Sequence, residues 1–103
     1  MARTIVPSEL LQSTNNNIKI GDTALDSVDT TSPDTAADNI AIGNAALTGN
    51  ISGNRNIGIG SSALTANTSG LDNTAVGHLT LDANTTGDKN TAFGSGALSA
   101  NTT

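Results

Sequence analysis

The chain has 103 residues, enough for one domain at most, and a net charge of -5. That charge argues against binding to nucleic acid or to an anionic membrane surface, and no apolar run is long enough to insert across a bilayer. Phe93 is the only aromatic residue and there is no Cys, so neither large side chains nor disulfides can stabilise a small core. Ile, Val, Leu and Ala must fill it, through unusually regular packing or through a core that several copies share.

Residues 1–16 form a polar segment without any repeat. Its apolar residues are Ile5, Val6, Leu10 and Leu11. We expect this N-terminal arm to cap the end of a repeat structure, to dock on another protein, or to do some of both. It has no apolar stretch of signal-peptide length, so we do not expect export by the usual route if Met1 is the native start.

Residues 17–38 contain a weak first copy of a repeat and an insertion. The copy reads Asn-Ile-Lys-Ile-Gly from Asn17 to Gly21, with Leu25 following. Residues 26–38 are rich in Asp, Thr and Ser and contain a Pro, which is typical of an acidic loop. This region predicts an irregular first coil followed by a loop.

Residues 39–103 consist of four copies of a 17-residue unit that start at Asn39, Asn56, Asn73 and Asn90. The last copy stops at Thr103, where Gly would come next, so we expect either a longer fibre or a natural stop there. Each unit has Gly at its fifth position and Leu at its ninth, and the first three have a second Gly at the fifteenth. The glycines, which we expect at sharp turns, are Gly43, Gly60, Gly77, Gly94, Gly53, Gly70 and Gly87.

The spacing within the unit predicts an all-β, parallel β-roll or β-solenoid with one coil for every 17 residues. Each unit opens with a short run that alternates with period 2 and ends at Gly, and a second short stretch surrounds its Leu. We therefore expect strand, turn, strand and turn in every coil. Stacked coils would align two apolar core ladders, Ile42-Ile59-Val76-Phe93 and Leu47-Leu64-Leu81-Leu98, and one amide ladder, Asn39-Asn56-Asn73-Asn90.

The residue before each initial Asn alternates in charge. Asp38, Arg55, Asp72 and Lys89 occupy this position. In a parallel stack each side chain would face neighbours of opposite charge, which is mildly favourable. We therefore predict a charge column along the stack, although chance alternation over four sites is not rare.

The repeat resembles those of known trimeric fibres. Asn73-Thr74-Ala75-Val76-Gly77 and the segment from Asn90 to Gly94 resemble the repeats in heads of trimeric autotransporter adhesins, and more closely those of fibre-like proteins of bacteriophages and environmental bacteria. The resemblance covers residues 39–103, and this unit is slightly longer than the adhesin repeats. It implies a homotrimer of parallel rolls, intertwined or side by side, whose aliphatic ladders face a shared axis.

The sequence offers no set of catalytic residues, and we expect no enzyme activity, cofactor or metal. His78 is the only His, and although three copies in a trimer could bind a metal, a solvated turn residue is the simpler interpretation. The four Asn-x-Ser/Thr sequences recur at the repeat spacing, which indicates turn chemistry. No calcium-binding loop pattern is present.

Three functions remain. The first is a trimeric bacteriophage tail fibre in the virion, whose N-terminal arm binds other virion proteins and which supports host attachment, with a host surface receptor as a further partner. A capsid decoration or head fibre is its close alternative. The second is a bacterial surface adhesin head, and the third is an ice-binding solenoid with rows of Thr.

Overall fold

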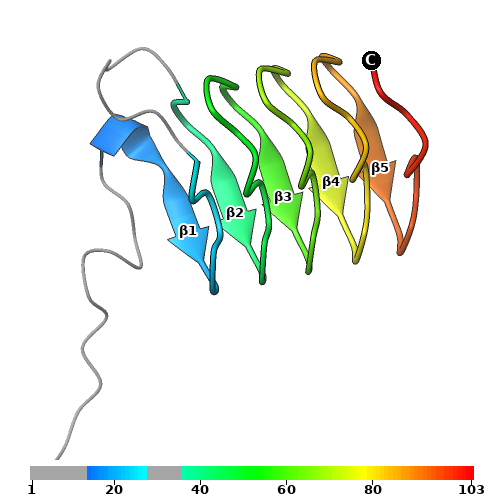
Figure 1. Cartoon of the computed structure of the whole chain (residues 1–103), viewed down its shortest axis with the longest axis horizontal. Helices are drawn as coiled ribbons and strands as arrows, with labels where there is room; N and C mark the ends of the chain where they lie inside the picture. The colour runs from blue at the N-terminus through cyan, green and yellow to red at the C-terminus, as the bar shows by residue number, and fades with distance from the viewer. Residues whose placement is uncertain (1–13, 28–35) are drawn as a thin grey trace, which may run out of the picture.

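The computed structural model describes residues 14–27 and 36–103 of the chain, and they form an all-β solenoid (Figure 1). Five short strands pair in parallel in the order β1-β2-β3-β4-β5. The strands are β1 (Ile18–Ile20), β2 (Ile40–Ile42), β3 (Ile57–Ile59), β4 (Thr74–Val76) and β5 (Thr91–Phe93), preceded by the 3-10 turn η1 (Thr14–Asn16). The predicted parallel β-solenoid is confirmed.

The strand register follows the repeat. Ile57 lies opposite Thr74, and Val76 lies opposite Phe93, each a step of 17 residues. Between β1 and β2 the step is longer, because Ile18 pairs with Ile40, 22 positions on. The weak first copy therefore stacks in register despite the insertion.

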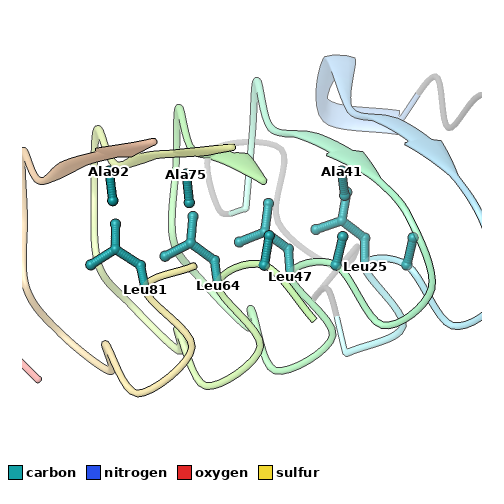
Figure 2. Packing of buried hydrophobic residues seen from close by; sticks show 10 residues of the cluster. Leu25, Ala41, Leu47, Leu64, Ala75, Leu81 and Ala92 are labelled. Carbon is teal, nitrogen blue, oxygen red and sulfur yellow. The ribbon is translucent and has the colours of Figure 1, made fainter. Parts of the chain in front are cut away.

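The interior of the solenoid is thin and made of small residues facing leucines. The middle residues of β2 and β4, Ala41 and Ala75, are fully buried. Leu25 and Leu64, each in the preceding coil, reach toward them from the opposite side of the solenoid (Figure 2). The strand of one coil and the Leu segment of the preceding coil thus close on each other, with room for only Ala or Gly on the strand side. Gly58 shows how tight the fit is, since a Cβ there would lie 3.3 Å from Leu47 Cγ.

The two predicted core ladders have different positions. Three members of the Leu ladder, Leu47, Leu64 and Leu81, are fully buried, whereas Leu98 of the last coil is 48% exposed. The other ladder exists in the predicted register but lies on the outward side of the strands, outside the coil. Its members Ile42, Ile59 and Val76 are half-buried and Phe93 is exposed. Alternation puts Ala41 inside, so Ile40 and Ile42 must face out.

The second predicted strand of each coil is also wrong. The Leu segments are turns. Leu47 has φ +53° and Ala45 has φ +62°, and left-handed residues cannot continue a strand. Backbone hydrogen bonds still join the coils there, because Leu47 N–H donates to Ala63 O at 2.9 Å and Leu64 N–H donates to Thr80 O at 3.0 Å.

The glycines serve two purposes. The set that ends the strands has φ between +111° and +136°, as expected for sharp turns: Gly43, Gly60, Gly77 and Gly94. In the second set, Gly53, Gly70 and Gly87, φ is outside this left-handed range and close packing requires the Gly. A Cβ on Gly53 would collide with the side-chain oxygen of Asn50 and lie 2.5 Å from Gly70 O.

The predicted N-terminal arm, with Ile5, Val6, Leu10 and Leu11, lies outside the described residues. Residues 28–35 of the predicted acidic loop do so as well.

Candidate interaction surfaces

The charge column is the first surface feature that the repeat produces. Arg55 Nε donates to Asp72 Oδ1 at 2.6 Å, and its Nη2 donates to Asp72 Oδ2 at 3.0 Å. This two-pronged contact lowers the pKa of Asp72 and raises the pKa of Arg55. Asp38 and Lys89, the other members of the column, act on the pair by charge alone: Asp38 further raises the pKa of Arg55, and Lys89 further lowers that of Asp72. The structure brings the predicted column together.

All four residues of this column have φ between +57° and +59°. Asn16, at the equivalent position of the first coil, shares this conformation, and its Nδ2 donates to Asp38 Oδ1 at 3.2 Å. The column therefore marks a corner of every coil and extends from the first coil to the last.

Beneath this corner lies the predicted amide ladder. Asn39, Asn56 and Asn73 are fully buried. Asn56 Oδ1 accepts from the backbone N–H of Asn73 at 3.0 Å, and Asn56 Nδ2 donates to Gly70 O at 2.8 Å. Each buried amide thus satisfies backbone groups of other segments, which offsets the cost of placing polar atoms inside.

A second amide ladder was missed by the sequence analysis, which treated its members as turn formers. Asn50, Asn67 and Asn84 are fully buried. Asn67 Nδ2 donates to Asn50 Oδ1 at 2.9 Å, and Asn84 Nδ2 donates to Asn67 Oδ1 at 3.0 Å. The recurrence of Asn at one position of every full unit was the available signal. These asparagines begin the Asn-x-Ser/Thr sequences, so the folded solenoid hides three of those side chains from solvent.

The outward side of the five strands is mostly apolar, and we call it the outer sheet face. Residues at the first and third positions of each strand form it: Ile18, Ile20, Ile40, Ile42, Ile57, Ile59, Thr74, Val76, Thr91 and Phe93. Ile18 and Ile20 are 41% and 40% exposed, and Phe93 is 69% exposed. The members on β2, β3 and β4 are half-buried, so two parallel rows of mostly aliphatic side chains run along the stack and stay partly open to solvent.

The described residues form no pocket and no group of His, Asp or Glu that could hold a metal ion. His78 is exposed, and its Nδ1 lies 3.1 Å from Ser61 O of the preceding coil. This is the solvated turn position predicted for His78.

No helix in the described part of the chain is long and apolar enough to cross a membrane.

Comparisons with family models, with curated proteins and with solved structures give no match to this chain.

Proposed function

We propose that this chain is a structural protein of a bacteriophage virion, a trimeric tail fibre whose N-terminal part attaches to the particle and which supports host attachment. The resemblance of the repeat to trimeric fibre proteins supports this proposal. The main observation behind it is the outer sheet face. Ala, Leu and Asn fill the interior of each coil, so the outward rows of Ile and Val do not contribute to that interior and are available to bind other chains.

The same face argues for the trimer. Contiguous apolar surface with a regular register marks interaction sites in soluble proteins. Three copies with parallel axes would place equivalent coils at one level, so that Ile42 and Ile59 meet their counterparts. The shared core would then supply the apolar burial that the thin interior of one coil lacks.

We propose that the protein acts as a rod and not as an enzyme. Its described residues consist of repeated turns and one sheet, held by backbone bonds and amide ladders. The N-terminal arm would bind other virion proteins, and a host receptor would be contacted further along. A capsid head fibre or a bacterial adhesin head could be built on the same solenoid, and finding the chain in purified tails, in capsids or on cells distinguishes the three.

The hydrogen bonds of the Thr row argue against the ice-binding alternative. Thr68 Oγ1 donates to Thr85 O at 3.2 Å, and Thr85 Oγ1 donates to Thr102 O at 3.3 Å. Their donor hydrogens are thus used between coils. A thermal-hysteresis assay at millimolar protein should show no activity.

Light scattering tests the trimer. The chain has a mass of 10.2 kDa, and we expect three times that value in solution. Ile59→Glu should reduce the mass to that of one chain, because it places charges in the shared core. Ile51→Glu is the matched control, since Ile51 is 49% exposed at a turn away from the outer sheet face. A folded wild-type monomer would exclude the trimer.

A particle-binding assay tests the arm. A variant that lacks residues 1–13 of the arm should keep the trimeric state of wild type but no longer co-purify with virions. Retained co-purification would move the attachment site to the solenoid.

A further inference from the structure

Lys19 occupies a position that belongs to the interior of the solenoid. It lies opposite Ala41 in the pairing of β1 with β2. The same register continues to Gly58, Ala75 and Ala92, so this inward column otherwise holds only Gly and Ala. The neighbours of Lys19 on β1, Ile18 and Ile20, are more exposed than Lys19 itself.

An inward lysine can keep its ammonium in water only at the end of the stack. Leu25 and Ala24 of the same coil are buried, and an unpaired ammonium among apolar atoms is strongly unfavourable. The four-carbon stem can lie along the apolar interior while the charge emerges past the edge of β1. A further coil placed on that edge would cover the charge.

The opposite end of the sheet carries no such charge. β5 is the last strand, and its inward residue, Ala92, is 4% exposed. The first N–H of β2, β3 and β4 donates to the following coil, with Ile57 to Asn73 O at 2.8 Å as an example. If the same pattern continued, the N–H of Thr91 would donate to a coil beyond β5.

We propose that Lys19 closes the β1 edge against a second copy of this chain and so prevents end-to-end stacking of solenoids. In-register stacking would join β5 of one copy to β1 of the next, with Lys19 of the second copy pressed against Ala92 of the first. Charges that point inward on an edge strand are one way in which sheets avoid edge-to-edge association. The proposal concerns the ends of the stack and is independent of trimer formation through the outer sheet face.

The test is the mass of Lys19→Ala in the full chain, measured by light scattering over a hundredfold range of concentration. We expect the weight-average mass of this variant to rise at least twofold over the range, with elongated particles in electron micrographs. Wild type should keep a constant mass. So should Lys89→Ala, which removes the same charge from the exposed charge column. A constant mass for Lys19→Ala, equal to that of wild type, would overturn the proposal.

A double variant moves the charge to the other edge. Lys19→Ala with Ala92→Lys places one lysine in the same column on β5, so we expect the constant mass of wild type to return. Continued growth of this variant, with the β-sheet circular dichroism of wild type, would show that an inward lysine does not block stacking and would overturn the proposal. If the double variant does not fold, the concentration dependence of the mass of Lys19→Ala is a sufficient test of the proposal.

Discussion

At the scale of single residues, the unusual feature of this chain is how many side chains accept a left-handed backbone. In the coil that starts at Asn39, Ala45, Leu47 and Arg55 have φ of +62°, +53° and +57°. Only glycine adopts such angles without cost. The cost is repeated in every coil, and the hydrogen bonds between coils, together with the buried Leu, must offset it.

The strand-ending glycines are the residues that the fold can least replace. Gly60 has φ +127°, and a Cβ there would lie 2.7 Å from both the carbonyl carbon and the oxygen of Gly77 in the next coil. We expect Gly60→Ala to lower the free energy of unfolding by about 3 kcal/mol or more, through strain and a clash with backbone. Urea unfolding measures the loss.

The control for this variant is Gly96→Ala. Gly96 has φ +71°, and a Cβ there would have no other atom within 4 Å. Ala45 already takes this conformation at the equivalent site. The loss for Gly96→Ala should be about 1 kcal/mol. Equal losses at Gly60 and Gly96 would contradict the role of close packing.

At the scale of the repeated element, the charge column couples neighbouring coils. Arg55 stands between Asp38 and Asp72. Arg55→Glu would align three acids, and we expect a larger drop in melting temperature than for Arg55→Gln, which only removes the ion pair. On the order of 1 M salt should reduce the difference between the two variants, because it screens exposed charges. A difference that salt leaves unchanged would exclude a charge effect.

The same pair predicts an acid dependence. Arg55 holds the pKa of Asp72 below its ordinary value of 3.8. A carboxyl with a lowered pKa in the folded state contributes stability above its ordinary pKa and loses it as the pH falls through the lowered value. Asp72→Asn should therefore flatten the fall of the unfolding free energy below about pH 4. If the unfolding free energy of Asp72→Asn fell as steeply with decreasing pH as that of wild type, this prediction would be contradicted.

Asp82, in the coil that starts at Asn73, has a buried oxygen atom that makes no hydrogen bond. Among the described residues, its Oδ1 is the buried side-chain atom without a hydrogen-bond partner. The equivalent position of the preceding coil holds Thr65, whose hydroxyl donates to Ser62 O at 2.6 Å. We expect Asp82→Thr to raise the unfolding free energy by about 1–2 kcal/mol, since it removes an unsatisfied buried oxygen and restores that bond.

Thermal unfolding checks this prediction. Asp22→Thr, at an exposed site, removes the same charge and should leave the melting temperature nearly unchanged. Equal gains from both variants would assign the effect to net charge instead of to the buried oxygen.

At the scale of the whole molecule, stability should vary along the stack. Each coil contacts only its neighbours, so interior coils are held on two sides and end coils on one. Burial of the Leu column follows this rule at the C-terminal end, where Leu98 is 48% exposed, whereas Leu25 of the first coil is 4% exposed.

Hydrogen exchange measures the gradient. Gly77 N–H donates to Ile59 O at 2.8 Å, and Gly94 N–H donates to Val76 O at 2.9 Å, so the two amides are matched in residue type and bond. We expect Gly94 to exchange about tenfold faster or more, because its coil opens locally. Equal protection would indicate that the stack unfolds as one unit.

The sequence alone was sufficient for the features that depend on the period. A 17-residue step fixes which residues stand above one another, so the parallel register, the buried Leu ladder, the first amide ladder and the charge column followed from it. Alternation also separated Ala41 from Ile42 on a strand, because successive side chains point to opposite faces.

Only the tertiary structure decided which of those faces is inside. The Leu turn approaches the strand so closely that only Ala or Gly fits opposite it, and this distance is set by segments that are not adjacent in the chain. The packing across the coil also replaced the expected second strand with left-handed turns and buried Asn50 and its equivalents. Periodicity is a local property that a sequence displays directly, whereas the width of the coil results from packing across it.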